Sequence, residues 1–209
     1  MKTFAIVCAF IFSLLSANVA SAAGSPNPWE QGLNDVFNAL SKLEVSPRSL
    51  ESVRVKSVVA RLAQASGEQW NVLVFSDVEI PAVSLPGNRV AIQAEFVRLL
   101  DDDGLAWVLA HEMSHVQAKH NETNYQLLVE TLGHAPRSLD EIQAGKQKMV
   151  PHLHAHEFEA DANGVVLATS AGFDAVSGSV AVLSLMSEGQ SATHPSTAAR
   201  IKAILALQK

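Results

Sequence analysis

Hydrophobic residues recur at the three- and four-residue spacing of amphipathic helices along most of the chain. Residues that favour helix ends, such as Ser, Asp, Pro and Gly, bound these periodic segments. The predicted helices cover about 29–43, 46–67, a segment from Asp101 onward, 151–171, a segment capped by Asp174 and a last one from about Ser196. Residues 121–150 have a mixed pattern that predicts no clear element.

Two short segments have the composition of strands instead. Residues 70–77 (WNVLVFSD) are rich in β-forming side chains, and residues 88–92 (NRVAI) follow the turn signal Pro86-Gly87. They suggest a small antiparallel sheet among the helices. The pattern therefore predicts a mostly helical α+β fold.

The first 22 residues have the three parts of a secretory signal peptide. Lys2 provides the charge, an apolar run covers residues 4–15, and small residues end the segment at Ala20-Ser21-Ala22. The apolar run is too short for a membrane span, and no later segment approaches one. We therefore expect an exported, soluble chain whose residues 23–209 form one domain without a transmembrane segment.

Cysteine usage and charge narrow the possible chemistry. Cys8 is the only cysteine and lies within the signal peptide, so a metal site in the mature chain has to use histidines and carboxylates. Without Lys2, 14 basic residues face 21 acidic ones, a net charge of 14 − 21 = −7. This balance argues against nucleic acid as a partner.

The strongest chemical signal is the stretch His111-Glu112-Met113-Ser114-His115 within a predicted helix. Residues four apart lie on one helix face, so His111 and His115 can offer imidazole nitrogens to one zinc ion. Glu112 is rotated from them by about 100° and can act on a water at the metal as a general base. The alternative is a helix with two polar residues near its surface.

A later predicted helix offers a third ligand, because its sequence HEFEADANG contains Glu157, Glu159 and Asp161. One carboxylate can bind the metal while another accepts the N–H of a ligand histidine. The alternative is an acidic face in contact with solvent. Three alternating histidines precede these acids, at positions 152, 154 and 156; on a helix they scatter, which argues against a second site, and loose metal capture is the alternative.

Four stretches together resemble metallopeptidase family forty-eight, the HtpX-type and CaaX-prenyl-protease-type zinc endopeptidases. They are LAWVLAHEMSHVQAKH (105–120), EFEADANG (157–164), AGFD (171–174) and HPSTAARI (194–201), and PAVSLPGNRVAI (81–92) resembles the segment that precedes the active-site helix. One departure concerns the Ser-Arg pair that commonly precedes the ligand glutamate. Leu153 and His154 stand there in this chain.

The resemblance implies a role for each matching residue. His111, His115 and Glu157 would be the zinc ligands, Glu112 the general base, and Asp161 an acid that supports a ligand. It also implies a strand near Leu85 beside the cleft. His194 would lie near the metal, as an oxyanion-stabilising catalytic residue or as a plug in the open zinc position, and Arg200 would support its loop.

These features predict an exported zinc endopeptidase of the zincin type, with one zinc ion per chain and a protein or peptide substrate in the periplasm of a Gram-negative cell. Two alternatives remain open. With His194 as a plug, the chain would be a latent or chaperone-like binding module. A zinc ion closed by four protein ligands would be structural, although such a site has no need for Glu112. The sequence indicates neither the specific substrate nor the oligomeric state.

Overall fold

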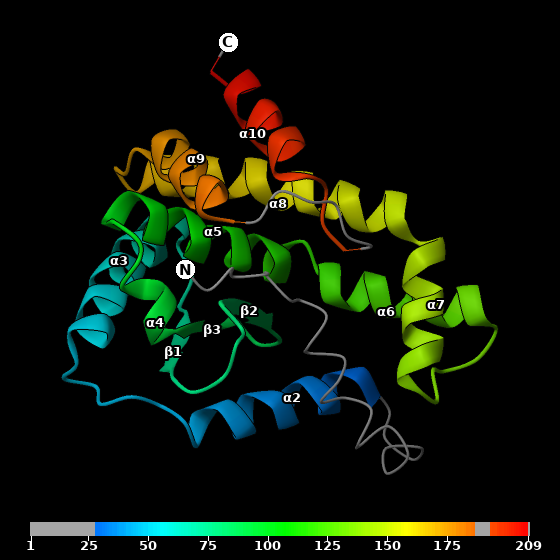
Figure 1. Ribbon diagram of the computed structural model, residues 1–209. Helices are drawn as coiled ribbons and strands as arrows, with labels where there is room; N and C mark the ends of the chain where they lie inside the picture. Colours follow the sequence, from blue (N-terminus) through cyan, green and yellow to red (C-terminus); the bar gives the residue numbers. More distant parts are fainter. Residues whose placement is uncertain (1–27, 187–192, 209) are drawn as a thin grey trace.

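Helices enclose one small sheet in the computed structural model, which describes residues 28–186 and 193–208. The predicted signal peptide lies outside the described residues. The helices are α2 (Pro28–Ser41), α3 (Leu50–Ser66), α4 (Ala94–Val97), α5 (Asp102–Gln117), α6 (His120–Leu132), α7 (Leu139–Lys148), α8 (Val150–Ser170), α9 (Ala175–Leu185) and α10 (Thr197–Ala206). In Figure 1 the sheet lies between α2 and α5, and α8, α9 and α10 lie beyond α5.

The sheet has three strands, β1 (Asn71–Phe75), β2 (Ala82–Leu85) and β3 (Arg89–Gln93), in the order β1-β3-β2. β2 and β3 are antiparallel, whereas β1 and β3 are parallel, so the sheet is mixed and the prediction of an antiparallel sheet was wrong. The reason is the tight turn at Gly87 and Asn88, whose φ angles are 78° and 53°. It reverses the chain after β2, and β3 then runs in the direction of β1.

Local capping determines where several helices begin, and these starts, together with the cap at Asp174, agree with the sequence prediction. The side chains of Asp101, Asp174 and Ser196 accept hydrogen bonds from backbone N–H groups in the first turns of α5, α9 and α10. The start predicted for α3 was three residues early. Ser49, rather than Ser46, caps this helix by accepting the N–H of Ser52.

Helix α5 is the centre of the molecule. Every residue from Gly104 to His115 is buried, because the sheet covers one side of the helix and α8 and α9 cover the other. The sequence pattern predicted a single apolar stripe, which was too narrow for a helix surrounded on all sides. The mostly helical α+β class is confirmed. Within the described residues, none of the helices has the length and apolar character needed to cross a membrane.

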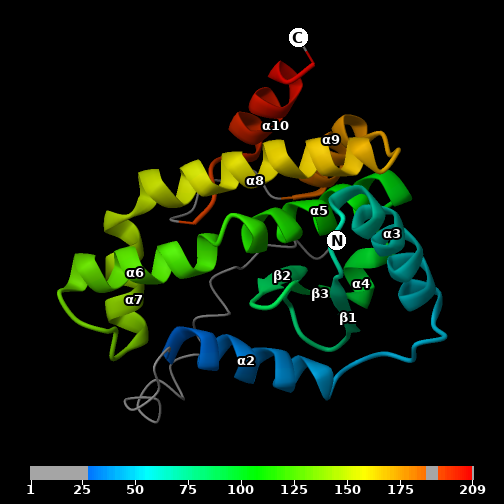
Figure 2. The same cartoon turned by 180° about the vertical axis from the view of Figure 1, so that it is seen from behind.

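The stretch 121–150 folds into α6 and α7, which the sequence did not predict. Figures 1 and 2 show both helices at the end of the molecule opposite α3. Ser138 caps α7 by accepting the N–H of Glu141, and the Glu141 carboxylate accepts the N–H of Arg137. This Ser-x-x-Glu pattern resembles a capping box and could have revealed the start of α7.

Candidate metal centre

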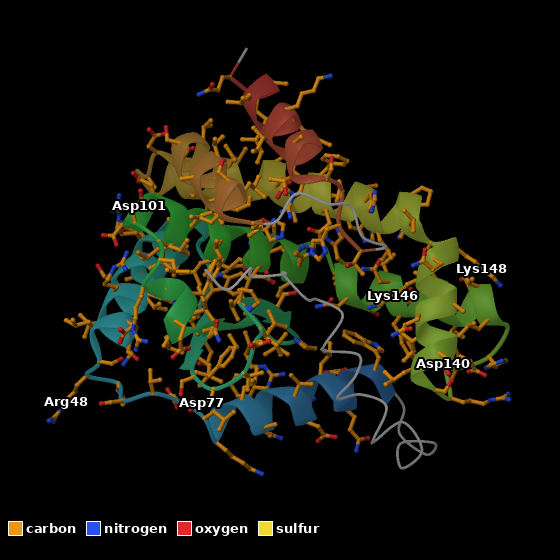
Figure 3. The ribbon with its side chains drawn as sticks, in the orientation of Figure 1. Arg48, Asp77, Asp101, Asp140, Lys146 and Lys148 are labelled. Atoms are coloured by element: carbon orange, nitrogen blue, oxygen red, sulfur yellow. The ribbon has the colours of Figure 1, made fainter. Side chains whose placement is uncertain are left out.

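Helix α5 presents His111 and His115 to α8, one turn apart. Both side chains are buried, and their ring centroids lie 4.7 Å apart with the planes almost perpendicular. The helix is fixed at its start by Asp101 (Figure 3). The Asp101 carboxylate accepts the N–H of Gly104 at 2.7 Å. A buried helix with a defined start holds the two imidazoles in a constant relative position.

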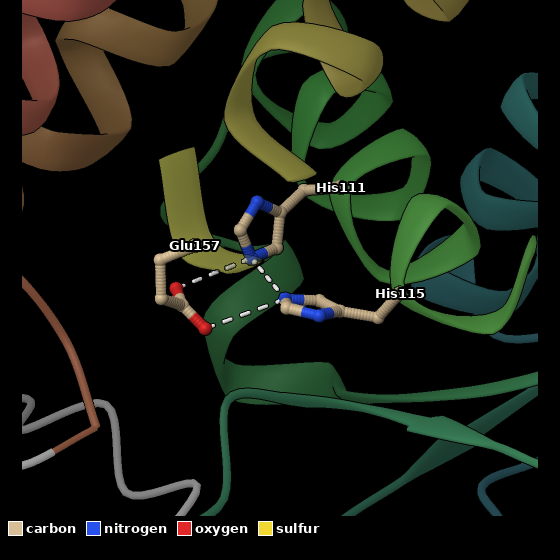
Figure 4. A group of neighbouring side chains, drawn as sticks. All are labelled: His111, His115 and Glu157. Atoms are coloured by element: carbon tan, nitrogen blue, oxygen red, sulfur yellow. Dashed lines mark hydrogen bonds and ion pairs between the residues drawn. The ribbon is translucent and has the colours of Figure 1, made fainter. Parts of the chain in front are cut away.

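Glycine allows α8 to approach α5 closely at this point. A Cβ atom on Gly164 would lie 3.0 Å from the backbone nitrogen of His111 and 3.1 Å from its Cα. Because glycine has no Cβ atom, the backbones of the two helices can come this close where they cross at Gly164. Two turns earlier on α8, Glu157 is buried and directed at the two histidines (Figure 4).

His111, His115 and Glu157 have the geometry of a three-ligand metal site. One ligand atom from each lies within 4.8 Å of the others. The two Nε2 atoms are 3.1 Å apart, and the Glu157 oxygens lie 3.4 Å from His115 Nε2 and 3.7 Å from His111 Nε2 (Figure 4). A tetrahedral zinc ion with bonds of about 2.0–2.1 Å separates two nitrogens by about 3.3 Å.

The chemistry of these donors also fits zinc. Two imidazoles and one carboxylate are a common ligand set for catalytic zinc, with a fourth position left open. Glu157 Oε2 is buried and has no hydrogen-bond partner among the described residues, so it is available as a ligand. Burial alone would raise the pKa of Glu157, but the charges of His194 and His115 and the hydrogen bond to His115 hold it well below its usual range.

Asp161 and Arg200 form a buried ion pair behind His111. Arg200 donates two hydrogen bonds to the Asp161 carboxylate, at 2.8 and 2.5 Å, and Asp161 Oδ1 lies 3.1 Å from His111 Nδ1. Burial would raise the pKa of Asp161, but the hydrogen bond and charge of Arg200 lower it. Because Asp161 is ionised, it can accept Nδ1–H of His111 and leave Nε2 free for the metal.

His115 has a different neighbour, which the sequence did not predict. Its Nδ1 lies 2.9 Å from Nδ1 of His120, and His120 Nε2 lies 3.5 Å from Glu159 on α8. Burial, followed by the charges of His115 and His156, lowers the pKa of His120 to about 3, so this ring is neutral near pH 7. Lys119 has a positive φ of 56° between α5 and α6 and turns the chain, a break that helical periodicity does not reveal.

The three alternating histidines lie on α8, but the predicted scatter around the helix holds for His154 alone, because His152 and His156 are four residues apart and share one face. His156 stacks on His120 with centroids 3.9 Å apart, and the His152 ring meets His156 edge-on at 4.2 Å. Among the described residues, the only group with metal-ligand geometry is that of His111, His115 and Glu157. Loose metal capture by the His-rich tract therefore has no support in the geometry of these residues.

Glu112 and His194 complete the set of predicted site residues at this centre. Glu112 lines two hollows, one that it shares with His115 and Glu157 and one that it shares with His111 and His194. His194 Nε2 lies 3.5 Å from Glu157 Oε2, and its Nδ1 is 2.8 Å from Thr193 Oγ1. Arg200 Nη1 is 3.6 Å from the same Glu157 oxygen. The seven residues to which the family resemblance assigned a role thus meet in one place.

Strand β2 runs beside these groups as an edge of the sheet. Its residues line three successive hollows: Ala82 with His111 and Glu112, then Val83 and Ser84 with Glu112 and His115, then Leu85 with His115. Asn121 of α6 donates its side-chain N–H to the backbone oxygen of Ser84 at 3.1 Å. The strand predicted near Leu85 is therefore present and follows the metal centre along its length.

Residues 48–208 match the family model described as peptidase family M48. The chain belongs to this family. M48 peptidases are zinc-dependent metallopeptidases, and the His-His-Glu group of this chain is a possible site for the ion. No curated protein matches this M48 chain in a sequence comparison.

One solved structure that resembles this M48 peptidase is the crystal structure of Ste24p from S. mikatae. The two share 14% sequence identity with a TM-score of 0.48. The match covers 95% of this chain and 63% of that chain, so the peptidase spans less than two thirds of the length of Ste24p.

Proposed function

We propose that the protein is a zinc-dependent endopeptidase. The observation that carries this proposal is the convergence of His111, His115 and Glu157, with Glu112 lining two hollows that these residues also line. Family membership supports metallopeptidase activity in general. The residue roles and the internal cleavage of proteins are our proposal.

In the proposed reaction, Glu112 carries the proton. When bound by His111, His115 and Glu157, zinc supplies Lewis acidity to the scissile carbonyl and lowers the pKa of the attacking water. Glu112 accepts a proton from this water as its oxygen attacks the carbonyl carbon. It returns the proton to the amine nitrogen as the C–N bond breaks.

The groups around Glu112 orient the reacting atoms. Asp161, held by Arg200, keeps His111 in one tautomer. His194 lies beside Glu157 and can donate a hydrogen bond to the developing oxyanion. An extended substrate can lie along the edge strand β2, because the hollows that this strand lines follow the same path past Glu112.

The test compares wild type with Glu112→Gln on an unfolded substrate such as casein, with the zinc content of both proteins measured. Gln keeps the shape of Glu but cannot accept the proton, so we expect equal zinc content and at least a thousandfold slower cleavage, on the order of the loss of a catalytic base. Cleavage by Glu112→Gln at the rate of wild type would rule out this assignment.

A latent or chaperone-like binding module is the second candidate, supported by the short distance between His194 and Glu157. If His194 occupies the open zinc position, it excludes water and blocks catalysis. His194→Ala separates the two candidates, because an increase in cleavage identifies a plug and a loss identifies a catalytic helper. A structural zinc site has less support, since the ligand group found among the described residues has three members and not four.

Location in the cell is proposed from sequence alone. Residues 1–22 have the features of a signal peptide, which supports export to the periplasm and substrates among envelope proteins. The mass of the protein purified from the periplasm tests this proposal. A chain that begins at Ala23 agrees with it, and a full-length chain that stays in the cytoplasm contradicts it.

A further inference from the structure

A cavity of about 80 Å³, open in part to solvent, extends from the metal centre toward α6 and α7. Glu112, His115 and Glu157 form its wall on the side of the centre. A side chain that enters the cavity therefore belongs to a substrate residue next to the scissile bond.

The wall away from the centre is mostly apolar and comes from two separate parts of the core. Leu33 and Val83 belong to the cluster between α2 and the sheet. Leu128, Met149 and Leu153 belong to a cluster that joins α6, α7 and α8. Both sets of side chains line the cavity, and the rings of Trp29 on α2 and Tyr125 on α6, whose centroids are 6.5 Å apart, lie on its wall as well.

The position of Leu128 on this wall is fixed from behind by α7. A Cβ atom on Gly145 would lie 2.2 Å from Leu128 Cδ1, so the space behind the leucine is already filled. Leu128 is almost completely buried. A larger side chain at position 128 would therefore extend into the cavity.

We propose that α6 and α7 form the specificity wall of the peptidase, with Leu128 and Met149 as specificity-determining residues. The cavity accepts a large apolar side chain, such as Leu, Met or Phe, from a residue adjoining the scissile bond. This inference rests on the proposed function, because it assigns the substrate class for the same site. It gives a role to the stretch 121–150, whose sequence pattern predicted none.

The expected selectivity follows from burial of apolar surface. A substrate with Phe or Leu at this position would bridge the two apolar clusters, whereas Ala would leave the cavity filled with water. Differences of one methylene in an apolar pocket change kcat/KM by about 10- to 200-fold. We expect a preference of at least about 100-fold for Leu or Phe over Ala.

The experiment uses a series of peptides that differ only at the residues flanking the cleaved bond. For wild type, kcat/KM is measured with Ala, Leu, Phe, Asp and Lys at each of these positions. Lys146, whose position on α7 is labelled in Figure 3, also lines the cavity. A preference for Asp over Leu and Phe would overturn the proposal and indicate recognition by Lys146 instead.

Leu128→Phe tests the wall directly. Since the added ring has to enter the cavity, we expect the Phe-to-Ala preference to fall at least tenfold. Ile142→Val is the matched control, because Ile142 is buried in the same cluster but does not line the cavity. Equal selectivity in wild type and Leu128→Phe would overturn the proposal. Met149→Ala provides a second test, since it enlarges the cavity and should favour Trp over Phe.

A binding measurement separates this inference from the proposed catalytic function. The affinity of the zinc-loaded Glu112→Gln protein for the same peptides is measured by calorimetry, which needs no cleavage. Leu and Phe peptides should bind more tightly than Ala peptides, and Leu128→Phe should weaken this binding. This result supports the specificity wall even if the wild-type protein does not cleave the peptides. Affinities that do not depend on the side chain overturn the inference even if wild type is an active peptidase.

Discussion

The two histidines of the metal centre are supported in opposite ways. His111 lies against Asp161, which is itself held by two hydrogen bonds from the buried Arg200. His115 lies against the neutral ring of His120, which leads to Glu159, a side chain that is 53% exposed. The support of His111 is a buried ion pair, whereas the support of His115 is a neutral ring whose next partner is an exposed side chain.

The two supports differ in how strongly they fix the tautomer of the histidine and in whether they bring a charge into the protein interior. An ionised carboxylate strongly favours the tautomer with Nδ1 protonated, but its charge has to be compensated inside the protein. A neutral imidazole accepts the same N–H with a weaker bond and brings no charge to be buried. We therefore expect the fold to depend mainly on the support of His111, and the support of His115 to affect mainly metal affinity.

The largest effect is expected from Asp161→Asn, which removes the charge and keeps the shape. The buried Arg200 would then lose the carboxylate that accepts its two hydrogen bonds, and breaking such a pair costs about 3–5 kcal/mol of unfolding free energy. Urea unfolding in the presence of a chelator measures this cost without a contribution from zinc. Asp102→Asn is the control, because Asp102 pairs with Arg54 but is 65% exposed, and a loss of about 1 kcal/mol or less is expected. Equal losses in the two variants would contradict the comparison.

A smaller effect is expected from His120→Ala. Removing the partner of a ligand histidine lowers metal affinity by about 10- to 100-fold, measured by competition with a zinc chelator. His120→Gln should restore part of this affinity, because its side-chain oxygen can accept the same N–H. His134→Gln is the control on an exposed loop after α6. An unchanged zinc affinity in His120→Ala would show that His120 does not position His115.

The smallest effect is expected from Gly164→Ala. The added methyl group presses on the backbone of His111 and costs about 1–3 kcal/mol. Alanine favours helices over glycine by about 1 kcal/mol, so the net loss should be about 1 kcal/mol. Thermal unfolding of Gly164→Ala and of Asn163→Ala, a change at the exposed neighbouring position, measures the difference. A gain in stability for Gly164→Ala would indicate that α8 does not approach α5 as closely as described.

Features that depend on neighbours in sequence were predicted well. The caps at Asp101, Asp174 and Ser196 act within three residues, and the spacing of His111 and His115 determines their common face on any helix. The acids on α8 were singled out from the sequence HEFEADANG, and the resemblance to family forty-eight then implied the roles of Glu157 and Asp161. The family is confirmed, while the roles of the individual residues stay predictions.

Features that depend on distant parts of the chain were missed. The parallel pairing of β1 and β3 follows from strand order in space, which short apolar segments do not reveal. His120 reaches His115 only because Lys119 turns the chain between two helices. The cavity wall joins Leu128 to Val83, residues of different elements, so no local pattern contains it.

The position of zinc in the protein tests the central claim most directly. Crystals of the zinc-loaded protein, measured at wavelengths on either side of the zinc absorption edge, locate the ion by its anomalous scattering. Our account predicts one ion per chain, about 2.0–2.2 Å from Nε2 of His111, Nε2 of His115 and a Glu157 oxygen. An ion bound instead between His120, His152 and His156, with none at the first group, would contradict it.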